Sequence, residues 1–291
     1  MYWSRAHLRL RHFLRRSRRQ RARCLAIALL PFVGVAHAAL PPSNPVPGGI
    51  AQVVLGQPEL KALVARFGTR RVIVSREFNQ WTALVGLPIS IEPGHYILTL
   101  EAEEMESLEP VVFSVKPART PVLQAPQQWP QPQQATLSKS ARRKARETVR
   151  AAISNWSDGQ LPDFSFIAPA SGEQLYPYSL LVTRGSGETL RHDYLTFLAS
   201  ARSEVVTPHN GTVLAVATLP VQGPTVFIDH GHGLISRLGG LEEVFVSEGE
   251  ALIQGAAIGG AATADERLIG EVNWALYLNG QKIDPEPFIA R

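Results

Sequence analysis

The run from Gly223 to Leu238 constrains the fold of this chain more than any other stretch. Residues 225–228 are a short apolar β-forming segment, and the Asp-His-Gly-His-Gly that follows carries two glycines suited to a tight turn. Leu234 restarts the apolar pattern, so the sequence predicts a β-hairpin. Short apolar segments and Gly or polar turns alternate again at 244–246, 251–253, 257–259 and 272–278. This pattern predicts a compact all-β unit over residues 205–289.

The basic character of the chain lies at its N-terminus. Residues 1–38 hold nine arginines and no acidic residue, whereas the rest carries 20 basic and 25 acidic residues. No nucleic-acid partner is therefore expected. The apolar core from Cys24 to Val35 and the small residues of Ala36-His37-Ala38 predict a signal peptide cleaved after Ala38, and export to the periplasm or cell envelope. In the alternative, the uncleaved segment is an anchor and provides the only membrane contact.

Composition divides the remainder into four parts. Residues 39–116 predict an Ig-like β-sandwich with Trp81 and Phe113 in its core, and its strands are expected at 50–55, 71–75, 81–85, 96–100 and 111–115. Residues 117–139 are a Pro/Gln-rich linker, residues 140–158 a helix, and residues 159–291 the second β domain. The expected fold class is mainly β. Cys24, the only cysteine, falls in the signal segment, so we expect no disulfide or thiolate chemistry.

The predicted helix has one basic and one apolar side. A solvated face explains the basic residues most simply, and contact with anionic envelope polymers is the alternative. The basic residues are Arg142, Arg143, Lys144, Arg146 and Arg150.

Four segments together resemble the lysostaphin-type, or LytM, zinc metalloendopeptidases, which cut peptide cross-links in bacterial cell walls. They are Thr225-Val-Phe-Ile-Asp-His-Gly-His-Gly-Leu, the Val-x-x-Gly-like repeat at 244–258, Leu278-Asn-Gly-Gln-Lys-Ile-Asp-Pro, and Asn210-Gly-Thr-Val. The sandwich is similar to the one that precedes this domain in some periplasmic members, through the stretches Trp81-Thr-Ala-Leu-Val-Gly-Leu-Pro-Ile and Pro93-Gly-His-Tyr. The resemblance implies a LytM-type β domain (duplicated hybrid motif) at the C-terminus.

The resemblance also implies where a zinc site would lie. The family binds zinc through a His-x-x-x-Asp motif and the second histidine of a His-x-His motif, and two further histidines assist catalysis. Counting from the matched segments places the ligands at His192, Thr196 and Asn273, and the assisting histidines at Gly240 and Glu271. One imidazole joined by a neutral hydroxyl and a neutral amide does not hold zinc tightly, so we expect no metal, no cofactor and no catalytic residue.

A degenerate member of this family is expected to bind rather than cut. Degenerate members activate cell-wall amidases, so the resemblance implies an inactive regulator or scaffold whose partner is peptidoglycan or an amidase, with a groove lined by His192, Glu271, Asn273 and Trp274. Two alternatives stay open: a structural peptidoglycan-binding module, and a zinc endopeptidase with a rearranged site that uses His192, Glu271 and either His209 or His232. His230 is expected to have a structural role in its turn.

Overall fold

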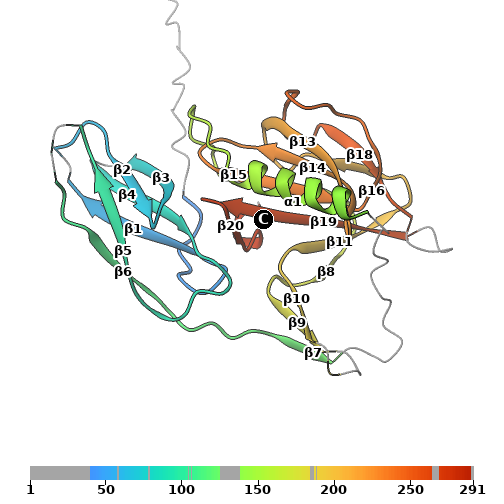
Figure 1. Ribbon diagram of the computed structural model, residues 1–291, viewed down its shortest axis with the longest axis horizontal. Helices are drawn as coiled ribbons and strands as arrows, with labels where there is room; N and C mark the ends of the chain where they lie inside the picture. Colours follow the sequence, from blue (N-terminus) through green and yellow to red (C-terminus); the bar gives the residue numbers. More distant parts are fainter. Residues whose placement is uncertain are drawn as a thin grey trace, which may run out of the picture. The chain divides into compact units, whose positions relative to one another are not determined.

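The computed structural model describes residues 40–289 except 58, 78, 104, 106, 125–137, 184–186, 188 and 264–268 (Figure 1). The predicted signal peptide and most of the predicted linker lie outside the described residues. Strands make up most of the regular structure, which confirms the prediction of a mainly β chain. No helix in the described part of the chain is long and apolar enough to cross a membrane.

The N-terminal domain contains all five predicted strands and one more. The six strands form a single antiparallel path in the order β1-β4-β3-β2-β5-β6, and its end strands touch, so the sheet curls around its own core. Phe113 lies in that core and Trp81 packs against it. The additional strand, β2, has only four residues and an arginine among them, which weakens its apolar pattern. The bounds are β1 Ile50–Gly56, β2 Val64–Phe67, β3 Arg70–Glu77, β4 Gln80–Gly86, β5 Gly94–Glu101 and β6 Val111–Val115.

A small three-stranded sheet follows this domain. Its strands are β7 Val122–Gln124, β9 Leu180–Thr183 and β10 Thr189–His192. Strand β7 pairs in parallel with β9, and β10 pairs antiparallel with the other edge of β9. The chain just after the N-terminal domain is therefore bound directly to a strand of the C-terminal region. His192 is the last residue of β10.

The C-terminal region is built on one large antiparallel sheet in the order β17-β13-β14-β15-β19-β11-β8, with β20 paired to β19. The predicted hairpin is confirmed as β14 and β15. The bounds are β8 Gln174–Tyr176, β11 Leu195–Ser200, β13 Gly211–Leu219, β14 Gly223–Asp229, β15 Leu234–Gly239, β17 Ala251–Leu252, β19 Ile269–Leu278 and β20 Gln281–Ile283. A second sheet, β12-β18-β16, consists of β12 Glu204–Val206, β16 Leu241–Val244 and β18 Ala257–Ala261, and a short 3-10 helix spans Glu286–Phe288.

Helix α1 spans Lys139–Ile153, so the predicted end at residue 158 was wrong. Ser138 caps its start by accepting a hydrogen bond from the Ala141 amide at 3.2 Å. The end lies at Ile153 because the chain turns at Ser154 and leaves the helix axis. The Trp156 ring then packs beneath the Arg71 guanidinium, 4.6 Å from the ring centroid, and its indole N–H bonds to Asp158. These contacts with the N-terminal domain replace the last predicted helical turn.

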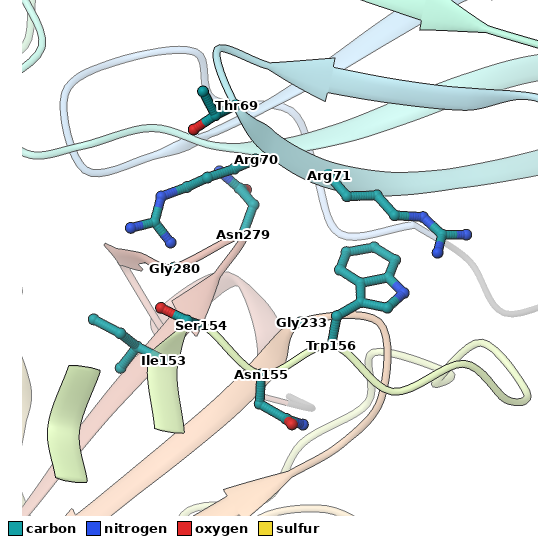
Figure 2. Close-up of a pocket in the computed structure, with 10 residues that line it drawn as sticks. All are labelled: Thr69, Arg70, Arg71, Ile153, Ser154, Asn155, Trp156, Gly233, Asn279 and Gly280. Carbon is teal, nitrogen blue, oxygen red and sulfur yellow. The ribbon is translucent and has the colours of Figure 1, made fainter. Parts of the chain in front are cut away.

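The N-terminal domain also contacts the turn between β19 and β20. The Asn279 side chain accepts a hydrogen bond from the Gly86 N–H at 2.6 Å and donates one to the Gly86 carbonyl at 3.1 Å. Beside this contact lies a pocket of about 360 Å³, with Arg70 and Arg71 on one side and the end of α1 on the other (Figure 2). Asn279 follows Asn273 by six positions, about 20 Å in an extended chain. The contact between Asn279 and Gly86 therefore lies just beyond the end of β19, far from the predicted zinc-ligand positions.

Candidate functional site

Two of the three predicted ligand positions are direct neighbours in the large sheet. Asn273 on β19 pairs with Thr196 on β11, and on its other side with Gly239 on β15, which pairs with Thr225 on β14. Paired residues in an antiparallel sheet point to the same side, and we call the side that carries these four residues the site face. The opposite side holds the core, which includes Val226, Leu238, Trp274 and Leu195.

Thr196 and Asn273 hydrogen-bond to each other. The Thr196 hydroxyl, fully buried, donates to the side-chain oxygen of Asn273 at 3.0 Å. A zinc ion needs a charged or strongly basic donor at each corner, whereas these two groups are neutral and bind one another. The donor set therefore does not fit the zinc ion that the family resemblance implies.

His192 lies between two tyrosine rings. Its imidazole centroid is 5.1 Å from that of Tyr176 and 4.5 Å from that of Tyr194. Burial lowers the pKa of His192 below its usual value near 6.5, so the ring is neutral at pH 7. Its buried Nδ1 atom has no hydrogen-bond partner among the described residues. The His192 ring is thus held by aromatic packing.

Glu271 adds a carboxylate beside this aromatic pair. It lies two residues before Asn273 on β19, and hence on the site face. Although Glu271 is an exposed residue, the surrounding protein partly desolvates its carboxyl group. This desolvation raises the pKa of Glu271 above the usual value. Burial raises the pKa of both tyrosines, and the nearby Glu271 charge raises each further. Tyr176, His192, Tyr194 and Glu271 therefore form one cluster beside the site face.

Gly240 has a backbone that excludes a histidine. Its φ is +80°, and a Cβ atom there would lie 2.0 Å from the carbonyl oxygen of Glu271. The Gly240 amide donates to the Gln222 carbonyl at 2.7 Å, and its carbonyl accepts from Ala262 at 2.9 Å. The backbone is thus fixed on both sides. Any side chain at this position requires the chain itself to move.

The prediction that Trp274 lines a groove was wrong. Trp274 has no solvent exposure, and its indole N–H donates to the Ser236 hydroxyl at 3.0 Å within the core. Successive residues of a strand point to opposite sides, so Asn273 and Trp274 cannot share one face. Of the four predicted groove residues, Asn273 and Glu271 lie on the site face and His192 lies in the cluster beside it.

The structure does not assemble the rearranged metal site. His209 Nε2 lies 2.7 Å from Asp163, and the His209 ring stacks on Phe166. His232 Nε2 instead bonds to the Gly159 carbonyl at 2.9 Å. Across the described ranges, no three His, Cys, Asp or Glu side chains are grouped to hold a metal.

His230 is part of the core. Its Nδ1 donates to the Asn210 carbonyl at 2.7 Å, which leaves Nε2 to accept from the Ser236 hydroxyl at 2.8 Å. Burial lowers the pKa of His230 to about 3, so the ring stays neutral. The Ser236 oxygen in turn accepts from Trp274. This chain of hydrogen bonds gives His230 a structural role.

Arg237 is a further site-face residue that the sequence analysis missed. It is 6% exposed, pairs with Ala275, and places its guanidinium 5.8 Å from the Tyr194 ring centroid. Its Nε and Nη2 atoms have no hydrogen-bond partner within the described part of the chain. Nearby, Lys282 forms an ion pair with Asp193 at 2.5 Å. The alternation along β15 could have revealed Arg237, since it is two residues from Gly239 and therefore faces the same side.

Helix α1 covers part of the site face. Ala145 and Ala152 of the helix pack against Phe227 of β14 and Ala215 of β13. Phe227 lies two residues from Thr225 and so shares its side of the sheet. Strand β14 is two strand spacings, about 10 Å, from β19. The helix therefore lies over β13 and β14, beside the row that holds Thr196 and Asn273, and Figure 1 shows it in front of the large sheet.

Two family models match the chain. Peptidase family M23 matches residues 191–285, and the peptidase family M23 N-terminal domain matches residues 43–116. A search of the curated proteins returned no match.

Solved structures resemble the chain to different extents. A crystal structure from Pseudomonas aeruginosa that carries the name peptidase M23 is 27% identical, with a TM-score of 0.65 over 84% of this chain and 95% of its own. Two further structures are more distant, each 17% identical with a TM-score of 0.38 over 44% of this chain. They are Csd3 from Helicobacter pylori, of which 35% is covered, and a zinc containing peptidase from Vibrio cholerae, of which 40% is covered. The predicted resemblance is confirmed: the chain carries a peptidase family M23 domain, with the N-terminal domain of that family ahead of it.

Proposed function

We propose that this protein is a catalytically inactive member of peptidase family M23 that binds or regulates the peptidoglycan-remodelling machinery of the cell envelope. The observation that carries the proposal is the hydrogen bond between Thr196 and Asn273, which joins two zinc-ligand positions through neutral groups. The backbone at Gly240 supports it independently, because that position leaves no room for an assisting histidine.

The surface around the lost site has the character of a binding surface. Two tyrosines, a neutral histidine and the Glu271 carboxylate offer aromatic faces beside hydrogen-bonding groups. Such a mixture suits a peptide or glycan, or a side chain of a partner protein. We infer that peptidoglycan or a cell-wall amidase contacts this cluster.

The proposed location is the periplasm or cell envelope. It rests on residues 1–38, whose arginines, apolar core and small-residue cleavage site are those of an export signal. The mature protein would then begin at Ala39. All the groups discussed above lie in the mature part of the chain.

The first experiment measures the metal content of the mature protein, residues 39–291, after dialysis against trace zinc. We expect no stoichiometric zinc in the folded protein and no digestion of purified peptidoglycan, with or without a chelator. Near-stoichiometric zinc that is lost in a His192→Ala variant, together with chelator-sensitive digestion, would overturn the proposal and establish a peptidase with a rearranged site.

A second experiment separates regulation from simple attachment. Purified peptidoglycan is incubated with an envelope amidase, with and without the mature protein, and both amidase activity and co-sedimentation are measured. Stimulation that is reduced by Glu271→Gln but not by Glu243→Gln, an exposed carboxylate on β16, supports a regulator that acts through the cluster. Co-sedimentation without stimulation identifies a structural wall-binding module instead.

A further inference from the structure

Helix α1 concentrates positive charge on its exposed side. It holds six basic residues and one acidic residue in fifteen positions. The other residues after position 38 carry 14 basic and 24 acidic side chains. A strongly cationic helix thus lies on an otherwise acidic protein. The basic residues are Lys139, Arg142, Arg143, Lys144, Arg146 and Arg150.

This arrangement works against the stability of the helix. Its first turn contains no acidic residue, so cations face the positive end of the helix dipole. Lys139 and Arg143, Arg142 and Arg146, and Arg146 and Arg150 are like-charge pairs at i,i+4 spacing, which repel. The exposed pair of Arg143 and Glu147, at 3.6 Å, opposes this repulsion. Helix stability therefore does not account for the charge.

The apolar side of the helix is already used. Ala145 and Ala152 are buried against the sheet, with Val149 packed beside them. The helix therefore cannot insert its apolar side into a bilayer. It holds its arginines above the part of the site face that it covers, beside the row of Thr196 and Asn273.

We propose that the cationic side of α1 binds the carboxylates of peptidoglycan peptides whose strand also passes over the site face. The inference rests on the proposed wall-binding function and adds a second contact surface to it. Arginine forms bidentate hydrogen bonds with carboxylates, and four of the six cations are arginines. A narrow polymer meets only the helix and the adjoining site face, whereas a broad anionic bilayer also meets the acidic remainder of the protein and is repelled by it. Charge complementarity therefore favours the polymer.

The test is co-sedimentation of the mature protein with purified sacculi over a range of salt concentrations. The variant Arg143→Gln/Arg146→Gln/Arg150→Gln removes three exposed charges, and Gln preserves helix propensity. We expect about tenfold weaker binding at low salt and a smaller dependence on salt, since screened surface charges carry the interaction. The matched control, Lys61→Gln/Lys116→Gln/Arg119→Gln, removes the same charge from exposed sites elsewhere and should bind as the wild type does.

Two further arms identify the ligand. Sacculi whose carboxylates have been converted to neutral amides should bind the wild type as weakly as untreated sacculi bind the Gln variant. The variant Arg143→Lys/Arg146→Lys/Arg150→Lys keeps the charge and should keep most of the binding, and circular dichroism checks that each helix is intact. Unchanged binding of the Gln variant, or unchanged binding to amidated sacculi, overturns the proposal. Loss of binding by the Gln variant to vesicles of anionic phospholipid alone, with sacculus binding unchanged, assigns the helix to a membrane instead.

This test is independent of the proposed lack of catalysis. Zinc binding and peptidoglycan digestion would overturn the inactive state and leave the role of α1 standing. Binding to sacculi that does not depend on α1 would overturn the proposed role of the helix and leave the proposed inactive state standing.

Discussion

The Thr196 hydroxyl and the Asn273 side-chain oxygen lie 3.0 Å apart, joined by a hydrogen bond where the family would place an aspartate and a histidine on one zinc ion. The β11 and β19 backbones hold both positions in register. Under the proposed function, the backbone of the site is kept while its zinc-binding side chains are replaced. Restoring the donors is a direct test of this interpretation.

The double variant Thr196→Asp/Asn273→His should gain zinc. Together with His192 it supplies two imidazoles and a carboxylate, which is a sufficient ligand set. Because residue 196 is buried, the new carboxylate should destabilise the metal-free protein, and added zinc should raise its Tm. Elemental analysis and thermal unfolding with and without zinc measure both effects. Adding His192→Ala to the pair should abolish the gain, and a double variant without zinc would show that the frame has been lost as well.

The variant Gly240→Ala should strongly lower the stability of the fold. A methyl group there meets the Glu271 carbonyl oxygen at 2.0 Å, and we expect a loss of at least about 2 kcal/mol in the free energy of unfolding. Gly249→Ala is the matched control, because Gly249 has a similar φ of +84° and nothing within 4 Å of the added atom. That variant should lose only about 1 kcal/mol. Equal losses, measured by denaturant unfolding, would contradict a backbone clash at Gly240.

Asn279→Gly should loosen the contact between the two domains. The φ of Asn279 is +44°, which glycine adopts freely, so the variant removes the hydrogen bonds to Gly86 without adding backbone strain. We expect a loss of about 2 kcal/mol, since two buried backbone groups lose their partners. Hydrogen exchange of the Gly86 amide should accelerate, whereas the Phe227 amide in the large sheet should exchange as before. Unchanged exchange at Gly86 would mean that other contacts hold the domains.

Two groups with shifted pKa values, His230 and Asp284, should give opposite pH effects on stability. His230 has its pKa lowered to about 3, so below pH 6.5 the unfolded chain takes up a proton that the folded protein refuses, and stability falls with pH. Asp284 has its pKa raised to about 6, mainly by burial, so the folded protein takes up its proton first and gains stability over the same window. Between pH 7 and 5 the two effects are about 2 and about 1 kcal/mol, of opposite sign.

The variant Asp284→Asn isolates the histidine effect. It removes the opposing carboxyl, so its loss of stability between pH 7 and 5 should exceed that of the wild type by about 1 kcal/mol. Denaturant unfolding at the two pH values measures this difference. The same loss in both proteins would contradict the raised pKa of Asp284.

The sequence predicted the parts of the fold whose local pattern is strong. The hairpin of β14 and β15 was predicted because apolar strands and a Gly turn are adjacent in the chain. The pairing of β7 with β9 was not predicted, because it joins residues far apart in sequence. Helix α1 was predicted too long because the sequence does not reveal that Trp156 packs against Arg71 of another domain.

The candidate site was predicted by position but not by orientation. The motif spacing identified Thr196 and Asn273, which the sheet brings together. It also suggested Trp274, although strand alternation places neighbouring residues on opposite sides, and it passed over Arg237, which the same alternation puts on the site face. The conflict at Gly240 depends on a backbone 31 residues away along the chain, at Glu271, and no local pattern contains it.

The fixed backbone at Gly240 bears on how this domain can evolve. A polar side chain that has replaced a catalytic one can be exchanged back by a single codon change, whereas here the new side chain would collide with a neighbouring strand. A lineage returning to hydrolysis would have to reshape the chain at residues 239–241 before a histidine there brought any advantage. If the protein is inactive as proposed, a return to cleavage therefore requires a change in the backbone at Gly240 and not only an exchange of side chains.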